Sequence, residues 1–158
     1  MWIRDAVEED LPALLEIYNH AVLRTTSVWN DAPSDLDGRR AWHSQRAARG
    51  YPILVAVENS QVLGFASFGE FRPFSGYLHT VENSVYVRPS CHRRGVGRSL
   101  MWELILRARA RHAHVMIAAV EAGNVASIRL HESLGFRETG RLPEVGAKFG
   151  RWLDLVFL

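Results

Sequence analysis

Apolar residues recur at helical spacing in four parts of the chain. Over residues 10–22 they lie at intervals of three and four, with Pro12 placed in the first turn, where a helix tolerates proline. Residues 35–49 predict a second helix that ends at Gly50, and residues 97–110 a third with one apolar side. A fourth, short helix is predicted to begin at Asn124 as its N-cap and to end at Gly135.

The remaining apolar segments are short and predict strands. ILVAVE and QVLGFASFG flank Asn59-Ser60 and indicate a hairpin, while residues 114–121 are almost continuously apolar, as in a strand covered on both faces. Further strands are predicted over residues 1–4, 81–88, 136–141 and 149–157. The order β-α-α-β-β-β-α-β-α-β-β predicts an α/β (α+β) domain with helices on both faces of a mixed sheet.

The composition limits the class of protein. The chain has 158 residues, 47% hydrophobic and 23% charged, with a net charge of +2, which indicates one globular domain over residues 1–158. The single cysteine, Cys91, cannot form an internal disulfide, and the charged N-terminal residues do not fit a signal peptide. No apolar run reaches the ~20 residues of a membrane span. We therefore expect a cytoplasmic protein that makes no membrane contact.

A glycine loop precedes the third predicted helix. Gly95 and Gly97 allow a ligand to approach the backbone, and the helix that follows offers free N–H groups and a positive dipole end. Arg93, Arg94 and Arg98 add positive charge, so the loop suits a phosphorylated ligand. A tight turn with solvated arginines is the simpler alternative, because two glycines alone are a weak signal.

The segment SVYVRPSCHRRGVGRSLM resembles the acetyl-CoA-binding signature of the GCN5-related N-acetyltransferases (GNAT), Q/R-x-x-G-x-G/A. His92 replaces Gln or Arg at the first position, which leaves the main-chain donors of the loop unaffected. GFASFGEFRPFSGY, TVENSVYV, NVASIRLHESLGF and GAKFGRWLDLVF are similar to the phosphinothricin and methionine sulfoximine acetyltransferase branch. The similarity covers essentially the whole chain and implies a twisted, mostly antiparallel sheet.

This resemblance implies an enzyme that transfers the acetyl group of acetyl-CoA directly to the α-amine of a small amino-acid analogue. Glu82 occupies the position of the general base. His131 occupies a position where many relatives carry a tyrosine that protonates the departing thiolate. Arg72 is expected to bind the substrate α-carboxylate. The pocket walls are expected to be Phe74, Tyr77 and Trp29.

The resemblance also implies a set of residues that contact acetyl-CoA. The strand residues would bind the pantetheine arm, the loop residues its phosphates, Asn124 the region near the pantetheine, and the two serines the phosphate side. The predicted set is Val85, Tyr86, Val87, Arg93, Arg94, Gly95, Val96, Gly97, Arg98, Asn124, Ser127 and Ser133.

Several alternatives stay open at this point. Glu82 and Arg72 could be surface residues, His131 a half-buried structural histidine and Asn124 an N-cap alone. The enzyme could acetylate a protein N-terminus or a polyamine, although Arg72 near the expected base favours a zwitterionic substrate. The chain could also be a non-catalytic acyl-CoA-binding module.

Other partners and mechanisms fit the sequence less well. Cys91 next to His92 could suggest a thiol nucleophile, but adjacent side chains need not face each other, so this mechanism is not favoured. His112 and His114 lack further ligands for a metal site, so no metal is predicted. The arginines of residues 107–111 lie opposite an apolar helix face and suit a solvated surface, so no nucleic acid is expected. The resemblance implies a homodimer whose partner places its C-terminal segment near the substrate pocket.

Overall fold

The computed structural model describes all 158 residues. Its helices and strands follow one another as β1 (Trp2–Asp5), α1 (Leu11–Arg24), α2 (Leu36–Ala48), β2 (Ile53–Glu58), β3 (Gln61–Glu70), β4 (Thr80–Val87), α3 (Val96–Ala110), β5 (Val115–Ile117), β6 (Ala119–Glu121), α4 (Val125–Glu132), β7 (Gly140–Lys148) and β8 (Arg151–Phe157). No helix is long and apolar enough to cross a membrane.

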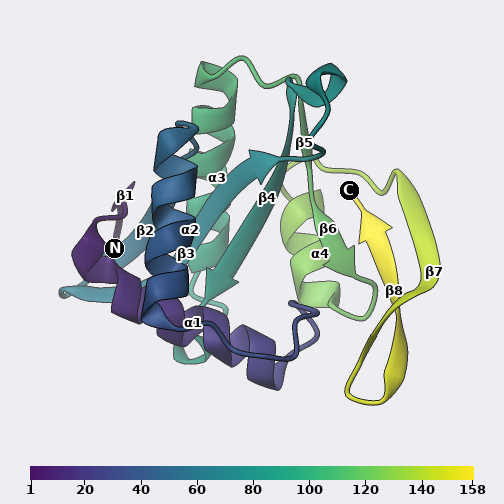
Figure 1. Ribbon diagram of the computed structural model, residues 1–158, viewed down its shortest axis with the longest axis horizontal. Helices are drawn as coiled ribbons and strands as arrows, with labels where there is room; N and C mark the ends of the chain where they lie inside the picture. The colour runs from purple at the N-terminus through teal and green to yellow at the C-terminus, as the bar shows by residue number, and fades with distance from the viewer.

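Five strands form the central sheet in the order β1-β2-β3-β4-β5, with only the β4–β5 pair parallel. Helices α1 and α2 lie on one face of this sheet and α3 lies on the other (Figure 1). Strand β2 is buried on both faces because each layer of helices forms its own apolar core, one around Leu14 and Phe65 and the other around Leu100 and Phe68. The predicted fold class is confirmed.

The local signals in the sequence give the expected turns and caps. Asn59 and Ser60 both have positive φ, 49° and 63°, as a two-residue hairpin turn between β2 and β3 requires. The Asp35 carboxylate accepts a hydrogen bond of 2.8 Å from the Gly38 N–H and caps α2. Asn124 caps α4 in the same way, with its Oδ1 3.1 Å from the Ser127 nitrogen.

The segment 114–121 differs from its prediction. It forms two short strands that join different sheets, because its hydrogen-bonding partner changes at Ala118. Ala118 exchanges two backbone hydrogen bonds of 2.9 Å with Leu158. The expected burial on both faces is also wrong for part of the segment, since Val115 and Ala119 are exposed. A run of apolar residues does not reveal where a strand changes its partner.

The C-terminal strands also differ from the predicted boundaries. The predicted strand 136–141 is wrong over residues 136–139, and the observed strand β7 spans Gly140–Lys148. Phe149 and Gly150 have positive φ and form the turn into β8 rather than its first residues. Strands β6, β8 and β7 make a second, antiparallel sheet. These strands and α4 lie beside the central sheet, beyond β5 (Figure 1).

Candidate active site

The two sheets separate along strand β4, and this separation leaves backbone groups without a neighbouring strand. Strand β5 pairs with β4 only from Thr80 to Glu82. The Arg88 N–H bonds to the Leu63 carbonyl at one end of the β3–β4 ladder, and the Phe71 N–H bonds to the Thr80 carbonyl at the other. By the alternation of antiparallel pairs, Asn83, Val85 and Val87 direct their backbone groups away from β3 and into the gap.

Asn83 lies where β4 and β5 separate, and its side chain bridges the two sides. Its amide nitrogen donates a 3.0 Å hydrogen bond to the Ile117 carbonyl, and its Oδ1 faces the Nε2 of His131 at 3.1 Å. The Nδ1 of His131 lies 2.8 Å from the Ser127 carbonyl, so both ring nitrogens face acceptors. This network fixes the position at which the strands part.

His131 is enclosed by the protein. It is 2% exposed, and its ring meets that of Phe136 edge to face. Burial lowers the pKa of His131, and the hydrogen bond to the Ser127 carbonyl opposes this effect. The structure therefore places His131 next to the gap but behind Asn83.

Glu82 is the last residue of β4 that pairs with β5, and on the other side it pairs with Gly69 of β3. Its side chain makes no hydrogen bond or ion pair within the chain, and burial raises its pKa, against the lowering effect of Arg72 and Arg46. A raised pKa makes a carboxylate a stronger proton acceptor. The side chain is thus a half-buried and unengaged carboxylate, the state that a general base requires.

The connection between β3 and β4 forms a cavity of about 190 Å³. Three predicted substrate residues, Arg72, Phe74 and Tyr77, line it together with Tyr51 and Glu70. The Arg72 guanidinium lies over the Phe71 ring, 4.5 Å from its centroid, and its charge lowers the pKa of Glu82. The structure therefore places Arg72 close enough to Glu82 for its positive charge to act on the carboxylate.

Trp29 is not among the residues that line this cavity. Its indole N–H donates a 2.9 Å hydrogen bond to the Thr26 carbonyl, and its ring packs so closely on Gly146 that a Cβ there would lie 2.2 Å from it. Lys148, 4% exposed, holds the same loop by donating hydrogen bonds to the carbonyls of Val22, Thr25 and Val28. The ammonium of Lys148 thus links the end of α1 to β7.

The glycine loop leads into the start of α3 through a residue with left-handed backbone geometry. Gly95 has a φ of +79°, and the first helical hydrogen bond runs from the Ser99 N–H to the Gly95 carbonyl at 3.0 Å. The preceding N–H groups have no partner in the helix. Gly97 has a different role, since a Cβ there would lie 3.2 Å from Leu130 of α4. Val96 is buried beside it.

The predicted arginines of the loop point in different directions. Arg94 pairs with Glu58 and approaches the Cys91 sulfur, whereas Arg98 donates a 2.9 Å hydrogen bond to the hydroxyl of Ser133, the C-cap of α4. Arg93 has a positive φ of 59° and is exposed. The His92 ring nitrogen Nε2 lies 3.0 Å from the Val87 carbonyl, so this side chain connects the loop to β4.

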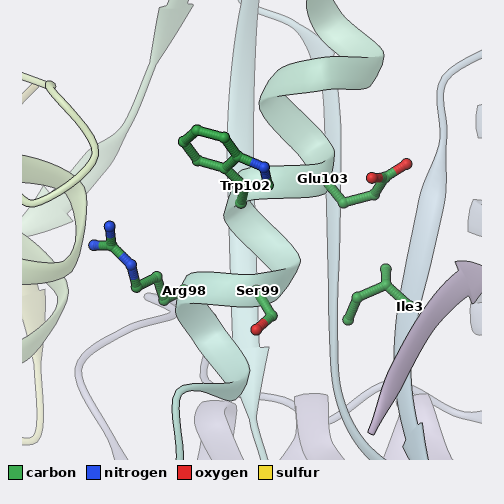
Figure 2. Close-up of a pocket in the computed structure, with 5 residues that line it drawn as sticks. All are labelled: Ile3, Arg98, Ser99, Trp102 and Glu103. Atoms are coloured by element: carbon green, nitrogen blue, oxygen red, sulfur yellow. The ribbon is translucent and has the colours of Figure 1, made fainter.

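Helix α3 carries a groove of about 480 Å³ on its outer surface. Figure 2 shows Arg98 and Trp102 one turn apart on one side of the helix, with Ser99 and Glu103 nearer to Ile3 of β1. Trp102 is 58% exposed. No group of three or more His, Cys, Asp and Glu side chains in the structure is arranged to hold a metal ion.

Two site residues were missed by the sequence interpretation. Asn83 breaks the apolar alternation of Val81, Val85 and Val87, and a polar residue on a core-facing position was the available signal. Arg46 lies on the sheet-facing side of α2, and its distance of four residues from Trp42 was the signal for that orientation.

The sequence model of the Acetyltransferase (GNAT) family matches residues 14–136. The chain is 56% identical over 157 residues to the L-methionine sulfoximine/L-methionine sulfone acetyltransferase of Pseudomonas aeruginosa, covering 99% of this chain and 91% of that protein. It is 40% identical over 157 residues to the phosphinothricin N-acetyltransferase of Alcaligenes faecalis, covering 99% and 80%.

Solved structures share the whole fold. A putative acetyltransferase from Salmonella typhimurium, solved with acetyl-CoA, is 54% identical with a TM-score of 0.98, covering 99% of this chain and 91% of that one. A structure named ribosomal-protein-alanine N-acetyltransferase, from Brucella melitensis, is also 54% identical with a TM-score of 0.98, covering 99% and 97%.

Proposed function

The chain belongs to the GNAT acetyltransferase family, and we propose that it transfers the acetyl group of acetyl-CoA to the α-amine of a small amino-acid analogue. The proposed substrates are of the methionine sulfoximine, methionine sulfone and phosphinothricin type, which the names of relatives at 56% and 40% identity indicate. The single observation that carries the proposal is the placement of Glu82 at the end of the gap between the sheets, with the charge of Arg72 beside it.

The residues around the gap fit acetyl-CoA as the second substrate. The N–H groups that open α3 and the side chain of Arg98 would bind its phosphates. The backbone groups of Val85 and the N–H of Val87, whose carbonyl faces His92, would pair with the amides of the pantetheine arm as an added strand. The side chain of Tyr86 lies on the other face of the sheet from those of Val85 and Val87, and its ring centroid is 5.1 Å from that of Phe65. Its predicted contact with the cofactor would therefore be through the backbone.

In the proposed reaction Glu82 accepts a proton from the substrate ammonium, directly or through one water. The neutral amine then attacks the thioester carbonyl and the C–N bond forms. As the C–S bond breaks, the nitrogen loses its second proton to give the amide, and the departing thiolate takes up one proton to give the thiol. His131 as the source of that proton stays a prediction. The Nε2 of His131 faces the Oδ1 of Asn83, so this contact would have to rearrange before the ring could donate a proton to the thiolate.

The charges around Glu82 favour one class of amine substrate. Arg72 and Arg46 both lower the pKa of Glu82, so two cations lie near the proposed base. A polyamine would bring further positive charge into this region, whereas an amino-acid carboxylate would be attracted to it. The geometry therefore favours a zwitterionic substrate. A protein amine is the second candidate, because the Brucella structure carries the name ribosomal-protein-alanine N-acetyltransferase.

One experiment separates these candidates. The purified protein is mixed with acetyl-CoA and single amines, and the released thiol is measured. We expect the largest kcat/KM with methionine sulfoximine, methionine sulfone or phosphinothricin, and little release with spermidine or an alanine-starting peptide. Preference for the peptide would replace the proposed substrate class, and binding of acetyl-CoA without thiol release from any amine would identify a non-catalytic module.

We also propose that the enzyme is a cytoplasmic homodimer. Leu142, Val145, Phe149 and Trp152 are exposed apolar side chains on the β7–β8 hairpin. An apolar surface of this kind is typical of a contact between protein chains. A second copy seated there would bring its own C-terminal hairpin close to the substrate region.

A further inference from the structure

Arg46 lies directly over the backbone of the central sheet. A Cβ built on Gly69 would lie only 1.7 Å from the Arg46 Nη1, so the guanidinium occupies the space of the missing side chain. No substitution at residue 69 can keep this contact, because even alanine would force the guanidinium to move. Glycine within a strand weakens it, and the close approach of Arg46 gives a physical reason for Gly69 near the end of β3.

The register of the sheet places this cation beside Glu82. Gly69 and Glu82 are direct partners in the antiparallel β3–β4 pair. Partner residues on neighbouring strands direct their side chains to the same face, with Cα atoms about 5.5 Å apart in a hydrogen-bonded pair. The guanidinium that covers Gly69 therefore lies on the same face of the sheet as the Glu82 carboxylate.

The charge of Arg46 is not taken up by another acid. Arg46 makes no ion pair or side-chain hydrogen bond within the chain, and the nearby Glu70 is paired with Arg49 instead. Trp42 and Tyr51 flank the guanidinium, each with its ring centroid 5.9 Å away. The guanidinium is thus half-buried between two aromatic rings, and its charge lowers the pKa of Glu82.

We propose that Arg46 is a positioning residue that keeps the Glu82 carboxylate ionised and able to accept a proton. This inference rests on the proposed function only for its catalytic consequence. The groups that face Glu82 are Arg46 from α2, Arg72 from the β3–β4 connection and the phenol of Tyr86 further along β4. Burial raises the pKa of Tyr86 to about 12, so the two arginines supply the charge at neutral pH.

The positive charge of Arg46 opposes the effect of burial on the Glu82 carboxyl group. Burial alone favours the protonated carboxyl group, which cannot accept a proton from the substrate. Arg72 is expected to bind the substrate carboxylate, which neutralises much of its charge once the substrate is bound. Arg46, which lies over Gly69, then provides the positive charge that continues to favour ionised Glu82.

The direct test measures the pKa of Glu82 without any enzyme assay. The carboxyl carbons of glutamate are labelled with ¹³C in the full-length protein, the Glu82 signal is identified by its absence in Glu82→Gln, and the signal is followed against pH. In Arg46→Gln the midpoint moves to higher pH, because a stabilising positive charge is gone. A midpoint equal to that of the wild type overturns the proposal.

Two further variants separate the charge of Arg46 from its packing. Gly69→Ala displaces the guanidinium without changing the charge of the protein, and it also moves the Glu82 midpoint to higher pH. Arg40→Gln is the matched control, since it removes one arginine from the same helix where the side chain is half exposed and paired with Glu8. A shift as large in Arg40→Gln as in Arg46→Gln would show a general charge effect and overturn the proposal.

The pH dependence of kcat/KM then tests the catalytic consequence. The acid limb moves to higher pH in Arg46→Gln while the plateau at higher pH remains, and one pH unit of displacement lowers the rate on the limb about tenfold. If the Glu82 signal shifts and the limb does not, Arg46 controls Glu82 but Glu82 is not the base. That result leaves the inference intact and contradicts the mechanism of the proposed function.

Discussion

Replacement of Glu82 by glutamine is predicted to separate activity from stability. The side chain makes no hydrogen bond or ion pair within the chain, so the isosteric amide leaves no partner unsatisfied. General base catalysis contributes about 10²–10⁴-fold to a rate. We therefore expect kcat to fall by that factor, which corresponds to about 3–5.5 kcal/mol of transition-state stabilisation.

The same substitution is expected to preserve or increase stability. Burial raises the pKa of Glu82 above its unfolded value, so the folded protein holds this proton more tightly than the unfolded chain. This contribution to stability is present at low pH and is lost as the pH rises through the folded pKa. Above that pH the ionised carboxylate costs stability, and glutamine avoids this cost, so the Tm of the variant should be at least that of the wild type.

Two measurements check this prediction. Thiol release gives kcat, and thermal unfolding of both proteins at about pH 5 and about pH 8 gives the pH dependence of the stability difference, which should grow with pH. Glu8→Gln is the control, because Glu8 is an exposed carboxylate whose only partner is Arg40. A kcat within a few-fold of wild type refutes the base assignment, and a lower Tm at both pH values refutes the electrostatic reasoning.

Four further predictions follow from the structure. Arg72→Ala raises KM for the amino-acid substrate about 30–100-fold, the value of a charge-assisted pair, and leaves KM for acetyl-CoA unchanged; an unchanged substrate KM removes Arg72 from the site. His131→Ala alters the pH–rate profile on the acid side of neutrality, because burial lowers the pKa of His131, and an unaltered profile argues against the acid role. Lys148→Met lowers the free energy of unfolding by about 2–4 kcal/mol in urea denaturation, because three carbonyls lose their ammonium donor; a loss below about 1 kcal/mol contradicts this. Light scattering gives twice the 17.9 kDa of one chain, and Trp152→Glu shifts the protein towards the monomer; a monomeric wild type refutes the dimer.

The sequence predicts most of the fold because its signals are local. The Asn59-Ser60 turn, the caps at Asp35 and Asn124 and the periodicity of α1 each depend on a few neighbouring residues. The division of the sheet is not local. Residues 115–117 and 119–121 belong to one mostly apolar run, yet the first segment pairs with β4 and the second with β8. Only the tertiary partners distinguish them.

The candidate site shows the same limit at the level of side chains. The resemblance to a family identifies Glu82, Arg72 and the glycine loop, but it does not say which way each loop arginine points. Arg94 is held by Glu58 and Arg98 by Ser133. These partners lie 36 and 35 positions away in sequence, so no local pattern contains them.

Two residues next to Glu82, Asn83 and Gly69, are unusual within a β-strand. Asn83 places an amide among the valines of β4, and Gly69 removes a side chain from β3, and each choice weakens an ordinary strand. Asn83 compensates by bonding to Ile117 and His131 at the point where the sheets part, and Gly69 by admitting the guanidinium of Arg46. Both residues border Glu82, Asn83 as its neighbour in sequence and Gly69 as its partner in the sheet. Because stability alone would favour an apolar residue at both positions, their joint occurrence around one carboxylate argues that the region is arranged for chemistry.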